Sequence, residues 1–241
     1  MSKNLKIFLG LSYLLIILIF LYYVFINIEI SRLNDFTYYK ELQSNIELYI
    51  SDDIYINIIY FSIFCIIWIS LLGFGSPLVI VSGILFGKWI GTIVSLISIV
   101  FGSLILYSIA NFFFKDLFKK ILDNKFKKYI DIFKKNEFYY YFIYRLIGGL
   151  GLPFPLQNTV PVIFGMKKTN YFFSSLLGLM PGFFVFNTIG AGLNNYIKKA
   201  ETFNMIELML TPEVYLPIIM FILLILSSLI IKKKYFNVRS K

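Results

Sequence analysis

The sequence contains no histidine and a single cysteine, Cys65, which lies within an apolar run. Histidine is the commonest general base and metal ligand near neutral pH, so its absence disfavours an ordinary hydrolase or a zinc enzyme. One cysteine can form neither an intramolecular disulfide nor a cysteine-rich metal site. No stretch resembles a nucleophile with its base. We therefore expect no enzymatic activity, no metal and no cofactor.

Acidic residues are also scarce, with 13 Asp and Glu against 23 Lys and Arg, and 59% of the 241 residues are hydrophobic. Several apolar runs reach the ~20 residues that a helix needs to cross ~30 Å of hydrocarbon. We therefore predict an all-α polytopic membrane protein. Because the basic residues flank apolar segments, the net charge of +10 favours cytoplasmic loops and anionic phospholipid headgroups over nucleic acid.

The apolar runs divide the chain into three parts, 1–53, 54–200 and 201–241. Residues 7–26 are predicted to form a membrane helix that lacks a signal-peptide cleavage site, and we expect it to be retained as an anchor. Residues 27–53 carry six acids and two bases, so this polar loop is expected to face outward. The last part holds a membrane helix over 213–231 and a basic tail that we expect in the cytoplasm.

The central part begins with apolar pieces that glycine and proline interrupt. Residues 54–72 are apolar, but the next piece, 78–86, is too short to cross a membrane alone. We predict a hairpin over 54–87 that enters the membrane and returns to the same side; a spanning helix followed by a kinked one is the alternative. The predicted tip of this first hairpin contains Gly73, Gly75, Pro77, Gly83 and Gly87.

Four further elements are expected in the central part. Residues 91–114 form a membrane helix with small residues spaced for close packing. Residues 115–137 are basic, and their apolar residues recur at three- and four-residue steps, which predicts an amphipathic helix in the cytoplasmic interface. A solvated loop that only fixes the topology is the alternative. A second hairpin is predicted over 138–165, and a membrane helix over 171–193.

The second hairpin contains Arg145, one of three arginines in the chain, inside an apolar run followed by glycines and prolines. A guanidinium at membrane depth costs roughly a few kcal/mol or more, so such a residue marks a site. Broken backbone is tolerated there only where protein buries it or a water-filled cavity faces it. The candidate lipid or substrate path consists of Arg145, Gly148, Gly149, Gly151, Pro153, Pro155, Gln157 and Asn158.

The expected partner of Arg145 follows from the absence of acidic residues in the same segments. No Asp or Glu lies between Ile54 and Lys115, or between Phe138 and Ala200. A lipid phosphate or backbone carbonyls are therefore the natural partners of the guanidinium. Two alternatives concern anchorage and local structure. Arg145 could snorkel to the cytoplasmic interface and bind headgroups or Glu137, and Asn158 could cap one hairpin arm.

Two glycine–proline units have similar spacing. The spacing from the first glycine to the proline is the same for Gly73, Gly75 and Pro77 as for Gly149, Gly151 and Pro153, and the gaps from these prolines to Gly87 and Gly165 differ by two residues. The pattern predicts two copies of a hairpin-plus-helix unit, with chance similarity in a glycine-dotted apolar chain as the alternative. If the first hairpin dips from outside and the second from the cytoplasm, every lysine-rich segment and both chain ends lie inside, and the repeats are inverted.

These segments together resemble the VTT-domain family, also called the SNARE-associated Golgi protein family, whose bacterial members include the DedA proteins. The resemblance covers roughly residues 55–200 and rests on PLVIVSGILFG at 77–87, on Arg145 with the following Pro153, Pro155 and Asn158, and on LLGLMPG at 176–182 followed by Gly190. It implies a multi-pass protein of the bacterial plasma (inner) membrane with two inverted re-entrant hairpins. It also implies movement of lipids between leaflets, as a scramblase or a flippase of phospholipids or lipid-linked phosphate carriers.

Some DedA-like members are thought to depend on the proton gradient through membrane-embedded acids. Because this chain lacks such acids, we expect lipid translocation without proton coupling. A membrane scaffold or assembly factor is one alternative. A small-solute transporter of the DedA type is another, although it would be expected to carry a midplane carboxylate.

Overall fold

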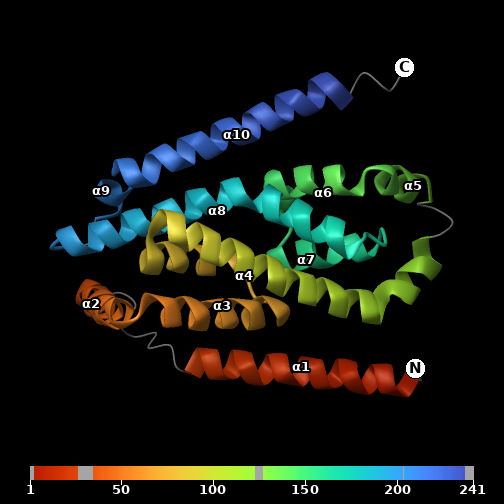
Figure 1. Cartoon of the computed structure of the whole chain (residues 1–241), viewed down its shortest axis with the longest axis horizontal. Helices are drawn as coiled ribbons and strands as arrows, with labels where there is room; N and C mark the ends of the chain where they lie inside the picture. Colours follow the sequence, from red (N-terminus) through yellow and green to blue (C-terminus); the bar gives the residue numbers. More distant parts are fainter. Residues whose placement is uncertain (1–2, 27–34, 123–126, 203, 237–241) are drawn as a thin grey trace.

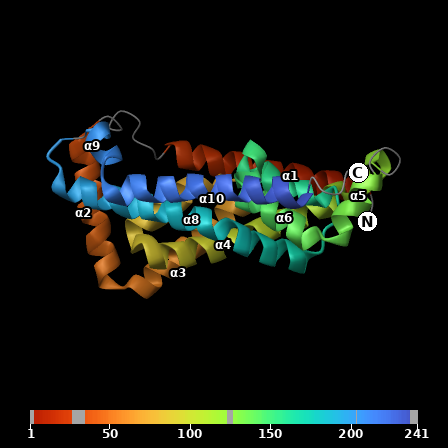
Figure 2. The ribbon, with the colours of Figure 1, turned by 90° about the horizontal axis from the view of Figure 1, so that it is seen from above.

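The structure is a computed structural model that describes residues 3–26, 35–122, 127–202 and 204–236. Within these residues the regular elements are helices, as the all-α prediction requires. Their bounds are α1 Lys3–Ile26, α2 Phe36–Asp52, α3 Ile54–Ser70, α4 Gly75–Leu122, α5 Lys127–Lys135, α6 Glu137–Leu146, η2 Gly148–Gly151, α7 Phe154–Thr159, η3 Val160–Val162, α8 Lys168–Lys199, α9 Met205–Met209 and α10 Pro212–Phe236. Most lie along the long axis of the molecule, whereas α2 runs across it at one end (Figures 1 and 2).

The helix α4 is two helices that fold back on each other. Gly87 has φ 73° and ψ 179°, a conformation outside the helical region that glycine adopts without a steric penalty. The Ser82 hydroxyl donates to the carbonyl of Gly91 at 2.9 Å, although residues nine apart in a straight helix are about 13.5 Å apart. The chain therefore forms a short arm over 75–86 and a long helix over 88–122.

The first hairpin consists of α3 and this short arm. Leu72 has φ 66° at the turn between them, and the Trp68 indole N–H donates to the carbonyl of Phe74 at 3.0 Å. A Cβ at Gly73 would overlap the Trp68 side chain, so glycine is needed there. Trp68 thus closes the tip of the first hairpin over its own backbone.

The second hairpin consists of α6 and the returning pair α7 and η3. Its tip includes Leu150 at φ 56° between glycines at positive φ, which explains the run of glycines in this part of the sequence. The Tyr141 hydroxyl donates to the carbonyl of Gln157 at 3.0 Å and joins the two arms. Gly165, at φ 59°, then occupies the turn that leads into α8.

The two hairpins begin at opposite ends of the molecule and meet in its middle (Figure 1). α3 starts beside α2, and α6 starts beside α5 at the other end. At the meeting point a Cβ on Gly75 would lie 3.2 Å from the Phe154 ring. The long helix 88–122 and α8 run in opposite directions and pack against each other, and they form the centre of the bundle.

Each long helix packs on the first arm of its own hairpin through one glycine. The close contacts are Gly102 with Ile66 and Ile69 in the first unit, and Gly178 with Phe142 and Arg145 in the second. The two sets are related by one constant spacing, since 178 − 102, 142 − 66 and 145 − 69 are all 76. Glycine allows the two backbones to approach this closely in both places.

Two sequence predictions about helix bounds need correction. The single amphipathic helix expected over 115–137 is divided, because α4 continues to Leu122, α5 covers Lys127–Lys135, and residues 123–126 lie outside the described residues. Asn136, at φ −145° and ψ 48°, separates α5 from α6. The three- and four-residue spacing of apolar residues therefore extends over more than one helix, and the sequence pattern did not show where one helix ends and the next begins.

The polar loop expected over 27–53 contains the helix α2, while residues 27–34 lie outside the described residues. The Asp35 carboxylate accepts from the backbone N–H of Thr37 and caps the start of this helix. Asp53 ends α2 and accepts from the N–H groups of Tyr55 and Ile56 at the start of α3. Asp35 and Asp53, which were interpreted from the sequence only as negative charges of an outward-facing loop, thus also act as helix caps.

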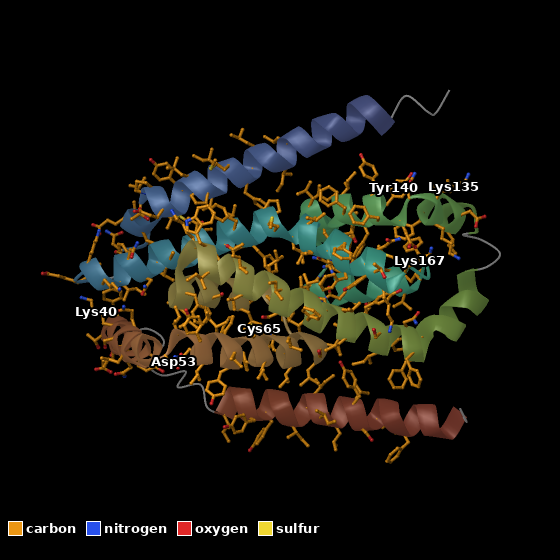
Figure 3. The ribbon with its side chains drawn as sticks, viewed as in Figure 1. Lys40, Asp53, Cys65, Lys135, Tyr140 and Lys167 are labelled. Atoms are coloured by element: carbon orange, nitrogen blue, oxygen red, sulfur yellow. The ribbon has the colours of Figure 1, made fainter. Side chains whose placement is uncertain are left out.

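Two helices of the described residues are long and apolar enough to cross a membrane, Gly75–Phe114 and Lys168–Lys199. The first contains the turn at Gly87, so its straight part begins after that residue. The N-terminus, the C-terminus and α5 lie at one end of the bundle, and α2 and α9 lie at the other (Figures 1 and 2). Lys135 and Lys167 are accordingly far from Lys40 and Asp53 (Figure 3).

Alanine substitution at two glycines of α8 tests the close packing. A Cβ at Gly178 would lie 2.6 Å from the Arg145 Cβ and 2.8 Å from the Phe142 carbonyl, so Gly178→Ala should destabilise the protein by about 1–3 kcal/mol. One turn further, a Cβ at Gly182 would lie 3.5 Å from the Phe221 ring, an ordinary contact. Gly182→Ala should be neutral or stabilising through its helix propensity, worth up to ~1 kcal/mol.

Thermal unfolding of the detergent-solubilised protein measures both effects. The midpoint should fall for Gly178→Ala and stay level or rise for Gly182→Ala. Equal midpoints for the two variants would contradict the close approach at Gly178.

Candidate functional site

The buried face of α6 carries the candidate site. Its three buried residues, Glu137, Tyr141 and Arg145, are spaced four apart and therefore lie on one face of the helix. This face packs against α8. Side chains on a helix lean toward its N-terminus, so the Arg145 side chain extends back toward Tyr141. The guanidinium carbon indeed lies 5.0 Å from the centre of the Tyr141 ring.

Arg145 is 2% exposed, and its hydrogen-bond partners come from two other helices. Nη1 donates to Oε1 of Gln157 at 3.3 Å, and Nη2 donates to Oδ1 of Asn158 and to the Tyr171 hydroxyl, the latter at 3.1 Å. The Phe154 ring lies 5.4 Å from the guanidinium carbon. Arg145 therefore joins α6, α7 and α8 in the interior, and the alternative of an arginine that snorkels to the interface does not fit the structure.

These partners of Arg145 are all neutral. Among the described residues Glu137 is the buried acid, and it lies eight residues earlier on α6, or about 12 Å along the helix axis. Its Oε1 accepts from the backbone N–H of Lys167 at 3.2 Å and from Nδ2 of Asn170 at 2.6 Å. Glu137 thus holds the start of α8, where its negative charge also interacts favourably with the helix dipole. Arg145, by contrast, is surrounded by amides and a hydroxyl.

Several buried polar atoms near Arg145 have no hydrogen-bond partner within the protein. They are Nε of Arg145, Nδ2 of Asn158 and the hydroxyls of Ser103, Ser175 and Tyr144. An unpaired buried polar group costs about 1–3 kcal/mol, so such a cluster is expensive unless another molecule pairs with it. Both nitrogen atoms are donors, and the hydroxyls can donate as well. The site therefore favours a ligand rich in hydrogen-bond acceptors.

Aromatic rings enclose this cluster on the side of α4. The ring of Tyr171 stacks on Tyr107 with 4.6 Å between ring centroids and on Tyr141 with 5.2 Å. The Tyr171 hydroxyl donates to the carbonyl of Ser103 at 3.2 Å and lies at the same distance from Oδ1 of Asn158. Tyr171 therefore links Arg145 to the long helix of the first unit.

The other predicted positions of the second hairpin form its tip. Gln157 donates from Nε2 to the carbonyls of Leu152 at 2.7 Å and Gly148 at 3.3 Å, and a Cβ at Gly149 would overlap its side chain. The structure thus brings Arg145, Gln157 and Asn158 together with the backbone of Gly148 and Gly149. Gly151, Pro153 and Pro155 shape the exposed or half-buried end of the hairpin. Oδ1 of Asn158 accepts from the side chains of Arg145 and Tyr171. The alternative prediction was that Asn158 caps one arm of the hairpin by bonding a backbone group.

The positions predicted for the first hairpin separate into two groups. Gly73 and Gly75 lie at the tip, with Pro77 just after it. Gly83 packs instead against the backbone of Asn187 in α8, and Gly87 forms the turn before the long helix. The position that corresponds to Arg145 at the constant spacing is Ile69, which is fully buried, so the charge belongs to the second unit only.

Sequence reasoning missed Tyr107, Tyr141 and Tyr171, and it mentioned Glu137 only as an anchor for Arg145. With 18 tyrosines in the chain, no single one drew attention. The four-residue spacing of Glu137, Tyr141 and Arg145 was a usable signal, because it places the three on one helix face. Tyr171 had no such signal, since only the packing of α8 on α6 brings it to the arginine.

Glu137 offers a test of how α8 is held. Glu137→Ala leaves the Lys167 N–H and the Asn170 amide without their acceptor and should lower stability by about 1–3 kcal/mol. Glu137→Gln keeps an acceptor oxygen and should lower the stability by a smaller amount. The midpoint of thermal unfolding checks both, with the exposed Glu201→Ala as the matched control. A midpoint for Glu137→Ala equal to that of the control would contradict the proposed contact.

Comparison with known families agrees with this architecture. Residues 73–192 match the family model of the VTT domain, and the matched range runs from the tip of the first hairpin through the long helix 88–122 and the cluster around Arg145 to Gly192 in α8. Searches of curated proteins and of solved structures found no match. The chain therefore belongs to the VTT-domain family of SNARE-associated, DedA-type membrane proteins.

Proposed function

We propose that this protein moves phospholipids or lipid-linked phosphate carriers between membrane leaflets, as a scramblase or flippase, and that Arg145 binds the phosphate. The observation that carries the proposal is the buried guanidinium with neutral partners and unpaired donors beside it. A phosphate supplies both negative charge and acceptor oxygens, and arginine binds two of them at once. It also stays charged when partly desolvated.

The distribution of acids supports movement without proton coupling. A proton relay through the membrane needs an ionisable carrier, usually a carboxylate. Between Ile54 and Lys115 and between Phe138 and Ala200 the chain contains no carboxylate, and the buried Glu137 lies at the outer end of the second hairpin, bound to the start of α8. The same absence argues against a small-solute transporter that depends on a midplane carboxylate.

The arrangement of the hairpins supports a route for the headgroup. Two broken segments that begin at opposite ends and meet in the middle resemble the inverted repeats of transporters, in which substrate sites lie at the repeat interface. The shared 76-residue spacing of the glycine contacts is consistent with such a repeat. On this interpretation both hairpins are re-entrant, and the headgroup passes between their tips.

The charge at the two ends supports a cytoplasmic location for both termini. The N-terminus, the C-terminus and the lysine-rich α5 share one end of the bundle. The acid-rich α2 lies at the other end. By the positive-inside rule we expect α5 on the cytoplasmic side, and the family resemblance implies that the membrane is a bacterial plasma membrane.

Substitutions at Arg145 and Asn158 test the role of the guanidinium in vesicles. The full chain is reconstituted with fluorescent phosphatidylglycerol, and a membrane-impermeant quencher reports how much lipid reaches the outer leaflet. Arg145→Ala should slow exposure by about 10–100-fold, because it removes charge-assisted hydrogen bonds worth about 1.5–3 kcal/mol. Lys88→Ala, at an exposed lysine in α4, should leave the rate unchanged.

Asn158→Asp separates a phosphate site from a structural arginine. The new carboxylate lies within reach of Nη2 and should pair with Arg145, which preserves or raises the unfolding midpoint. If Arg145 binds phosphate, the internal carboxylate competes and lipid exposure slows. An Asn158→Asp variant that has a raised unfolding midpoint and still exposes lipid at the wild-type rate would overturn the role of Arg145. A wild-type protein that leaves the inner-leaflet lipid protected would favour a scaffold.

Single cysteines test the orientation. Cys65 is fully buried and can be replaced by alanine, after which Ser44→Cys on α2 and Lys135→Cys on α5 report the two ends. In intact cells a membrane-impermeant maleimide should label position 44 and reach position 135 only after permeabilisation. The reverse pattern would place both termini outside.

A further inference from the structure

An apolar groove runs along the second hairpin, beside the Arg145 cluster. It has a volume of about 540 Å³ and is bounded by Phe133 of α5, Tyr140 and Tyr144 of α6, Leu150 of the tip, and Val160 and Phe164 of the returning arm. The residues that line it include tyrosines and no charged side chain. The groove therefore extends from α5 to the tip of the hairpin, and its surface suits a hydrocarbon.

The positive charge adjoining this groove lies at one end of it. α5 has the sequence KKYIDIFKK, and Lys134 and Lys135 follow directly after the lining residue Phe133. Both lysine side chains are exposed. Figure 3 shows Lys135 near Tyr140, at the α5 end of the second hairpin. At its other end, the groove is bordered by the apolar tip residues Leu150 and Leu152.

We propose that this groove binds one acyl chain of an anionic phospholipid, whose phosphate contacts Lys134 and Lys135. The charge pattern matches an amphiphile that has a long apolar part and an anionic group at one end. With a volume of about 540 Å³, the groove has room for an acyl chain.

The groove also adjoins the arginine. Tyr141 lines the groove and places its ring 5.0 Å from the guanidinium carbon, so one aromatic ring separates a bound chain from Arg145. The neighbouring Tyr144 lines the groove too, and its buried hydroxyl has no partner within the protein. A lipid held here is next to the site that the proposed function assigns to its phosphate. The inference nevertheless concerns binding alone, and it stands or falls without any measurement of lipid movement.

Photo-crosslinking tests the groove in the full chain. The protein is reconstituted in vesicles that contain phosphatidylglycerol with a photoreactive diazirine in one chain, and mass spectrometry locates the label. Labelled peptides should cover residues 132–164. Val160→Trp fills the groove and should reduce this labelling to background, whereas Ile97→Trp, at an exposed position of α4, should not. Ile143→Trp is a second groove-filling variant, and thermal unfolding confirms that each variant is folded.

The lysines are tested by comparing two lipids. Phosphatidylcholine with the same diazirine chain should label the groove less than phosphatidylglycerol. The double variant Lys134→Gln, Lys135→Gln should remove that preference, since each lysine near an anionic lipid is worth about a factor of five in binding. Labelling that ignores the lipid headgroup would overturn the role assigned to the lysines.

Two outcomes would overturn the groove itself. One is labelling of residues 132–164 that both folded tryptophan variants leave unchanged. The other is crosslinks between copies of the chain that use these residues, which would make the groove a protein interface. Asn158→Asp separates this inference from the proposed function, because it should preserve the fold, slow lipid exposure and leave groove labelling intact. Labelling that is lost while lipid exposure continues would remove the groove and keep the proposed function.

Discussion

The structure depends on how one positive charge is kept in an apolar bundle. Arg145 is held by two amides and a hydroxyl from α7 and α8, and aromatic rings cover its faces. A buried charge requires hydrogen bonds and a compensating partner, and here the protein provides the hydrogen bonds through neutral groups. The second hairpin, the start of α8 and the packing of α6 are all arranged around this requirement.

Close backbone packing makes that arrangement possible. Gly178 lets α8 approach α6 beside Arg145, and Gly102 gives the long helix of the first unit the same contact with α3. In lipid, packing of this kind replaces the hydrophobic effect as the main attraction between helices. The two units therefore share a helix geometry, while only one of them uses it to enclose a charge, since Ile69 stands where the other unit has its arginine.

Apolar run length was sufficient to predict an all-helical membrane protein, and the resemblance of the two hairpin units gave its family. Glycine and proline at turns and a charge at membrane depth placed Arg145, Gln157 and Asn158 in one candidate path. The expected partners of the guanidinium were a phosphate or backbone carbonyls, whereas the structure shows the side-chain amides of Gln157 and Asn158. The sequence was insufficient for the helix α2, whose acids serve as caps as well as charges. It also missed Tyr171, because the contact between the start of α8 and α6 arises from tertiary packing that no local pattern encodes.

The position of Phe154 links the two hairpins to the state of the arginine. Its ring touches the backbone at Gly75, where the tips meet, and also lies against the guanidinium of Arg145. Any motion that draws α7 away from the first tip therefore uncovers one face of the charged group in the same step. The contact between the tips and the cover on this face of Arg145 therefore depend on a single side chain.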